Sequence, residues 1–142
     1  MRLFTLAFLF DPSYSRVLLI HKKRPDWQAG KLNGIGGKLE SEETPLAGIV
    51  REIREETNLK IDAGLLRRFA QLHGHDWQVE VFASTVSGQE AKQMTDEEIE
   101  WVNISAIPPH AIVNLTWLTP MAIDRLKNGS PCVVRVYYQD HP

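Results

Sequence analysis

The segment Arg51–Glu56 combines three glutamates with two arginines at spacings that could hold a divalent metal ion. On a helix that turns about 100° per residue, Glu52, Glu55 and Glu56 lie at i, i+3 and i+4 on one face. Carboxylates crowded on one face repel one another unless they share a cation. Because every ligand would be an oxygen atom, a hard ion such as Mg²⁺ or Mn²⁺ is favoured, and such ions commonly bind substrate phosphates as well.

The same residues also fit a simpler interpretation, in which they form a solvated helix face. Arg51 and Glu55 lie four residues apart and would then form an ordinary surface ion pair. Exposed carboxylates are the rule in glutamate-rich helices. Taken alone, these six residues leave both interpretations open.

The element that must position these glutamates is a helix predicted over residues 44–57. Thr44 is a suitable N-cap, and Pro45 follows at the first helical position, where its missing N–H costs nothing. Asn58 is a plausible left-handed residue after the helix. An apolar stripe at i, i+3, i+4 and i+7 is expected to face the core, and it consists of Leu46, Ile49, Val50 and Ile53. The glutamates lie beside this stripe, so we expect them to lie outside the core.

The other elements follow from apolar runs and alternation. Strands are predicted over residues 3–10, 16–22, 65–73, 79–86, 101–104 and 132–138, and a second helix over residues 118–127. Residues 24–38 contain one proline and four glycines without periodicity, which indicates a long loop or a broken strand. Strands dominate over two helices, so we expect an α+β fold in which helices flank a mixed central sheet.

Composition excludes several classes of protein. The 142 residues fit one domain spanning residues 1–142, and the net charge of −2 argues against a binder of duplex nucleic acid. The single cysteine, Cys132, excludes an internal disulfide and a cysteine-rich zinc site. The apolar runs are too short to cross a bilayer, and residues 1–10 lack the features of a signal peptide. We therefore expect a cytoplasmic protein without a membrane partner.

A longer pattern around the glutamates resembles the Nudix box of the Nudix hydrolase family. It reads Gly-x5-Glu-x7-Arg-Glu-Ile-x-Glu-Glu-x-x-Leu and runs from Gly37 to Leu59. Six fixed residue types, each at roughly 6% usage, would match by chance about once in 10⁷ start positions or fewer. The pattern departs from the family at Asn58, where the box normally has glycine. Asparagine is the commonest other residue with positive φ, so a helix-ending turn is retained.

This resemblance implies the Nudix α/β/α sandwich and the hydrolysis of a nucleoside diphosphate linked to another group. It also implies roles for single residues. The metal ligands would be Glu52, Glu55, Glu56 and the carbonyl oxygen of Gly36, with Mg²⁺ or Mn²⁺ as the cofactor. Glu52 would also be a candidate base, Arg51 would orient the carboxylates, and Glu43 would be their outer partner.

Many Nudix enzymes recruit one more acidic residue from a loop beyond the box. The candidates are Asp96, Glu97 and Glu98, of which we slightly favour Glu97 as a catalytic residue. The alternative for each is an ordinary solvated acidic loop.

The segments before the box are similar to the MutT-type branch of the family, which includes the mammalian oxidised-purine nucleoside triphosphatases. That likeness places Asn33 and Lys23 in a nucleotide pocket, beside Gly37 and Lys38. For Lys23 the alternative is simple solvation within a basic run. Trp27, in the glycine-flanked loop, is a candidate for stacking on a base. Trp117 more simply fills the core.

The likeness weakens before the last helix. Relatives that select oxidised purines carry paired acidic residues there, and residues 114–120 contain none.

The leading functional hypothesis is a Mg²⁺-dependent hydrolase that cleaves a nucleoside triphosphate to the monophosphate and pyrophosphate. Removal of oxidised nucleotides such as 8-oxo-dGTP is its favoured biological version. Dinucleoside polyphosphates or capped RNA are alternative substrates, although the mild acidity weighs against RNA. A non-catalytic nucleotide sensor is a further alternative, but sensors on this scaffold tend to lose the box carboxylates. The sequence leaves the oligomeric state open.

Overall fold

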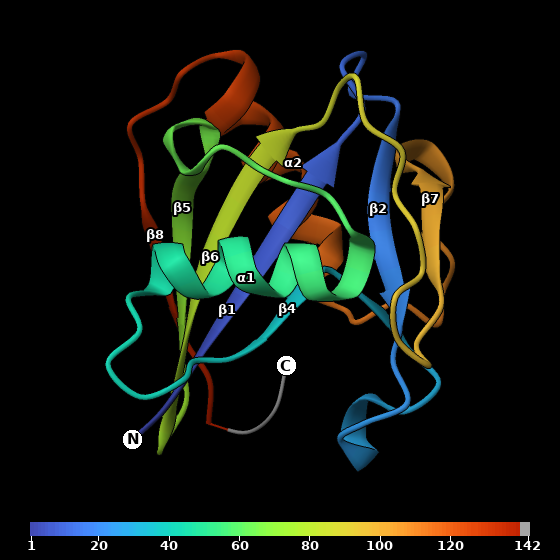
Figure 1. The fold of residues 1–142 in the computed structure, drawn as a ribbon. Coiled ribbons are helices and arrows are strands. Elements are labelled where there is room, and N and C mark those ends of the chain that lie inside the picture. Colours follow the sequence, from blue (N-terminus) through green and yellow to red (C-terminus); the bar gives the residue numbers. More distant parts are fainter. Residues whose placement is uncertain (140–142) are drawn as a thin grey trace.

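The computed structural model describes residues 1–139, and it contains one eight-stranded mixed sheet between two α-helices (Figure 1). The strands are β1 (Arg2–Phe10), β2 (Arg16–His21), β3 (Leu32–Asn33), β4 (Ile35–Lys38), β5 (Arg67–His73), β6 (Trp77–Thr85), β7 (Ile99–Asn103) and β8 (Val134–Tyr137). The helices are α1 (Pro45–Thr57) and α2 (Leu115–Lys127), with short 3-10 turns η1 (Asp26–Gln28), η2 (Ala63–Leu65) and η3 (Ile104–Ala106).

The centre of the sheet is the parallel pair of β1 and β6, which run side by side over the full length of β1. The strand order is β3-β2-β1-β6-β5-β8, while β4 pairs with β1 and β7 pairs with β2. The last six residues of β1 are all buried, because helices cover both faces of the sheet. Figure 1 shows α1 crossing in front of the sheet and α2 behind it, as the mixed sheet flanked by helices requires.

Helix α1 is held to the sheet by Ile49 and Ile53, which are fully buried in a cluster with Leu9 and Phe82. Burial of each such aliphatic side chain contributes about 1.5–3 kcal/mol to stability. Leu46 was expected in the same stripe, but it lies in the first turn and is 37% exposed. The buried stripe is therefore shorter than the apolar pattern predicts.

The predicted ends of α1 are confirmed. The hydroxyl oxygen of Thr44 accepts a hydrogen bond from the N–H of Ala47 at 3.2 Å, and Pro45 is the first helical residue. Asn58 adopts a left-handed conformation with φ of 61°, and its N–H donates to the carbonyl oxygen of Arg54. This cap lets the chain leave the helix directly after the glutamates.

Residues 24–38 form η1 and the broken strand made of β3 and β4, which is one of the two predicted alternatives. Other predicted boundaries are corrected by the structure. Helix α2 begins at Leu115 rather than residue 118, so Pro120 lies beyond its first turn. Burial of Leu115 and Leu118 outweighs the hydrogen bond that the proline forfeits. The last strand begins at Val134 rather than residue 132. Within residues 1–139, no helix is long and apolar enough to cross a membrane.

Candidate active site

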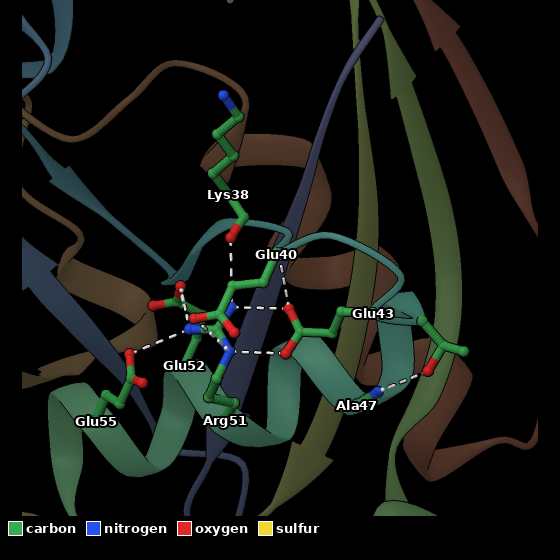
Figure 2. A network of polar contacts seen from close by, with 8 residues as sticks. Lys38, Glu40, Glu43, Ala47, Arg51, Glu52 and Glu55 are labelled. Carbon is green, nitrogen blue, oxygen red and sulfur yellow. Dashed lines mark hydrogen bonds and ion pairs between the residues drawn. The ribbon is translucent and has the colours of Figure 1, made fainter.

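Arg51 is the centre of the polar network on the exposed side of α1 (Figure 2). Its Nε and Nη2 donate to the two carboxylate oxygens of Glu43 at 2.7 and 2.8 Å. Its Nη1 donates to Glu52 at 3.0 Å and to Glu55 at 3.1 Å, and Nη2 reaches the carbonyl oxygen of Lys38 at 3.3 Å. The hydrogen bonds from Arg51 lower the pKa of Glu43 to about 2. One guanidinium therefore fixes three carboxylates and ties them to the end of β4.

Two glycines let β4 pass between β1 and α1. A β-carbon on Gly36 would lie 2.0 Å from the carbonyl oxygen of Thr5 in β1. A β-carbon on Gly37 would lie 2.6 Å from Oε1 of Glu52 in α1. Any larger residue would collide with backbone in the first case and with a carboxylate in the second. The close approach places Gly37 against Glu52 of α1, while Gly36 packs onto the backbone of β1.

Glu56 differs from the other glutamates because it is buried, with only 8% of its surface exposed. The prediction that it would lie outside the core is wrong. Residues 92–94 cover this end of α1, where the N–H of Met94 donates to the carbonyl oxygen of Glu56. Burial, followed by the neighbouring carboxyl group of Glu52, raises the pKa of Glu56 to about 9. Its Oε2 is buried and has no hydrogen-bond partner among the described residues.

Glu97 is the buried member of the acidic loop, with 6% of its surface exposed. Its Oε1 lies 3.3 Å from Nζ of Lys22, and its Oε2 accepts the N–H of Lys23 at 2.6 Å. The negative charge of Glu97 also contributes to the raised pKa of Glu56. Asp96 is instead exposed and pairs with Arg24 at 2.6 Å. The third candidate, Glu98, is exposed as well.

These donors suit a hard divalent cation. The unpartnered oxygen of Glu56 is a buried acceptor that a cation would satisfy, and the surrounding donors are carboxylates. Within residues 1–139, no three acidic, histidine or cysteine side chains already converge as a ligand set, since Arg51 holds Glu52 and Glu55. Ion binding would therefore compete with Arg51 for these two carboxylates.

A cavity of about 680 Å³ opens beside β4 and continues towards the start of β6. It is lined by four of the five residues expected in the substrate pocket, namely Trp27, Asn33, Gly37 and Lys38. Gly36, expected as a metal ligand, also lines it. The amide of Asn33 already donates to Oε1 of Gln28 at 3.0 Å and accepts the N–H of Gly34 at 2.8 Å. These contacts fix the orientation of the Asn33 side chain at the wall of the cavity.

The structure places Lys22, rather than Lys23, at this cavity. Lys22 lines the wall with its side chain 15% exposed, whereas Lys23 is exposed and contributes no lining. Consecutive residues at the end of a strand point to opposite sides, so a run of two lysines does not say which one faces inward. Trp117 is also absent from the lining and packs against the core under α2, as predicted.

Asn114 lines the cavity and was not singled out from the sequence. It is 4% exposed; its Nδ2 donates to the hydroxyl oxygen of Tyr138 at 3.4 Å, and its Oδ1 has no partner among the described residues. An asparagine before a helix ordinarily indicates an N-cap, and Asn114 does occupy that position. Its side chain, however, makes no capping hydrogen bond. The carbonyl oxygen is thus a buried acceptor, on a residue that lines the cavity, which no donor among the described residues satisfies.

Comparison with known proteins agrees with this geometry. Residues 2–126 match the model of the NUDIX domain. Two curated relatives are described as oxidized purine nucleoside triphosphate hydrolase. The Mus musculus protein is 46% identical over 61 residues, which are 43% of this chain and only 37% of that protein. The Danio rerio protein is 32% identical over 113 residues, which are 75% of this chain and 69% of that protein.

The fold is also similar to that of solved structures. A MutT protein from Bacillus halodurans superposes with a TM-score of 0.71 over 98% of this chain and 91% of its own, at 20% identity. The NUDIX model covers most of the chain, and Glu56 of the box is buried. The chain therefore belongs to the Nudix hydrolase family and is of the MutT type.

Proposed function

We propose that this Nudix hydrolase is a divalent-metal-dependent enzyme that cleaves a nucleoside triphosphate to the monophosphate and pyrophosphate. The observation that carries the proposal is the buried carboxylate of Glu56, whose Oε2 has no partner among the described residues. It is one of several acidic groups gathered near a cavity of nucleotide size. A buried carboxyl oxygen without a partner destabilises a protein, and Glu56 neighbours Glu52, which lies against Gly37 at the cavity wall. A cation bound there would satisfy this oxygen and favour the ionised form of Glu56.

In this proposal Glu52, Glu55, Glu56 and Glu97, with the carbonyl oxygen of Gly36, would hold Mg²⁺ or Mn²⁺. When bound, the ion would neutralise phosphate oxygens and lower the pKa of an attacking water. The choice between Mg²⁺ and Mn²⁺ is part of the proposal, because an all-oxygen donor set accepts both.

The reaction would be hydrolysis of one phosphoanhydride bond, with separate roles for Glu52 and for two lysines. A water oxygen forms a bond to phosphorus, and the bond to the pyrophosphate leaving group breaks. Glu52 accepts the proton of that water, since its carboxylate is held by Arg51 at 3.0 Å and lies against Gly37. Lys22 and Lys38, which line the cavity, attract the polyphosphate chain.

The base would lie at the other end of the cavity, towards Asn114 and Trp27. The free Oδ1 of Asn114 suits an N–H donor on the base edge, while Nδ2 of Asn33 is held by Gln28. An oxidised purine is the favoured base, supported by the descriptions of the Mus musculus and Danio rerio relatives. Residues 114–120 contain no acidic residue. In this proposal the amide of Asn114, rather than a carboxylate, therefore forms the hydrogen bond to the base.

The test is a panel of substrates assayed for product release with and without Mg²⁺. The panel holds normal and oxidised deoxynucleoside triphosphates, sugar nucleotides, dinucleoside polyphosphates and capped RNA. We expect an oxidised purine triphosphate to be cleaved fastest, with pyrophosphate as a product, and chelation to abolish activity. Preferred cleavage of a dinucleoside polyphosphate or capped RNA would replace the substrate. Binding without turnover of any substrate would make the chain a sensor.

A further inference from the structure

A second cavity of about 230 Å³ lies at the other end of β6. Ser84 and Thr85, at the end of this strand, line it together with residues of η2, the start of β5 and the end of α2. Figure 1 shows these segments meeting beside the arrowhead of β6. Val79 lines the first cavity instead, and five residues of a strand span roughly 17 Å, so the two cavities are separate.

The charge of this second cavity is positive. Arg67 and Arg125 line it, and none of its described lining residues is acidic. The hydroxyls of Ser84 and Thr85 add neutral hydrogen-bonding groups to the same wall. Two guanidinium groups line one cavity that has no acidic lining residue among those described, so an anion there would meet charges of the opposite sign.

Arg125 is the cavity residue whose guanidinium group lacks hydrogen-bond partners among the described residues. Its Nε is buried without an acceptor, and within residues 1–139 its side chain makes no hydrogen bond or ion pair. A buried donor without a partner costs more free energy than a typical hydrogen bond contributes. Arg67 is held in place, because its Nη1 donates to the carbonyl oxygens of Gly64 and Leu66. One guanidinium is thus fixed at the wall while the other lacks an acceptor.

We propose that this second cavity binds a phosphate-type oxyanion. Guanidinium groups bind tetrahedral oxyanions through paired N–H donors, and hydroxyls complete such sites. Free phosphate, pyrophosphate and the phosphate of a nucleotide share this chemistry. The inference does not depend on the proposed function, since it rests on residues at the far end of the sheet.

The experiment is an amide NMR titration of the full, metal-free chain with inorganic phosphate, with pyrophosphate and with AMP in separate arms. We expect saturable shifts at Ser84 and Thr85, followed separately from Gly36 and Gly37 of the first cavity. The arm with the tightest binding identifies the source of the phosphate. Arg125→Gln and Arg67→Gln should each weaken that binding at least about tenfold, because each removes a charged donor.

Lys127→Gln is the matched control, since Lys127 is an exposed cation in the last turn of the same helix and does not line the cavity. It should leave binding unchanged. The proposal is overturned if no arm gives saturable shifts at Ser84 and Thr85. It is also overturned if Lys127→Gln weakens binding as much as Arg125→Gln, or if both arginine variants bind as the wild type does. In those cases Arg125 only stabilises the end of α2.

Discussion

A β-carbon on Gly37 would lie 2.6 Å from Oε1 of Glu52, so the missing side chain of this β4 residue leaves the space that the Glu52 carboxylate occupies. The atom it would meet is the end of a flexible side chain, which can move. Gly37→Ala should therefore fold, with the carboxylate of Glu52 displaced. Because the proposed mechanism needs this group in place, we expect kcat to fall at least about 100-fold, in line with the cost of misplacing a catalytic group.

Gly36→Ala is the companion variant, and it should behave differently. Its β-carbon would lie 2.0 Å from the carbonyl oxygen of Thr5, which is backbone in the central strand. We expect a large loss of thermal stability or failure to fold. A Gly37→Ala variant that loses stability as severely as Gly36→Ala would contradict the specific link to Glu52.

Glu56→Gln tests the metal site, because it keeps the shape of the side chain but cannot ionise to bind a cation. We expect kcat to fall by orders of magnitude at saturating Mg²⁺ while the fold is retained. Mg²⁺ should raise the melting temperature of the wild type, since a ligand that binds only the folded state stabilises it. That increase should be lost in the variant.

The control for this experiment is Glu90→Gln, which makes the same change at an exposed glutamate. It should keep both activity and the response to Mg²⁺. Near-normal kcat in Glu56→Gln would remove Glu56 from the ligand set.

Glu97 and Glu98 are neighbours with different surroundings, so paired variants separate their roles. Glu97→Gln should reduce kcat at least about 100-fold and also destabilise the protein by about 1–3 kcal/mol, because it leaves the half-buried ammonium of Lys22 without its charged partner. Glu98→Gln should remain within about twofold of the wild type, as expected for an exposed side chain. Steady-state kinetics and thermal melting measure both effects. Equal losses in the two variants would show that the loop acts through its total charge.

Asn114→Ala should change base selection more than the chemical step. The variant removes the free Oδ1 from the cavity, so kcat/KM for the preferred nucleotide should fall about 10- to 100-fold and the spread across bases should narrow. Asn128→Ala at the other end of α2 is the control, since within residues 1–139 Asn128 forms hydrogen bonds only with Asp124. An equal loss for all nucleotides would assign Asn114 to the fold.

Glu43 should make stability depend on acid pH. Its pKa is lowered from 4.5 to about 2 by hydrogen bonds from Arg51, so the ionised form stabilises the folded state at neutral pH. This contribution is present above the unfolded-state pKa and is lost as the pH falls from about 4.5 towards 2. Glu43→Gln should therefore lower the melting temperature at pH 7, with a gap to the wild type that narrows at pH 3. The exposed Glu42→Gln should show no such narrowing.

The sequence alone determined helix α1, the box and the family. Thr44, Pro45 and Asn58 act on backbone groups within a few residues, and the spacing of the glutamates follows from the period of one helix. Such local effects do not depend on the rest of the chain. For this reason the helix ends and the Arg51 network with Glu43, Glu52 and Glu55 agree with the prediction.

Only the tertiary structure decided which side chains are buried around the site. Glu56 is buried in the neighbourhood of Lys22 and Glu97, which lie far from it in the sequence. Lys22 lines the cavity in place of Lys23, and Asn114 joins the same wall from a segment far along the chain. Burial and charge pairing depend on segments brought together by the sheet, and no spacing within one helix or strand contains that information.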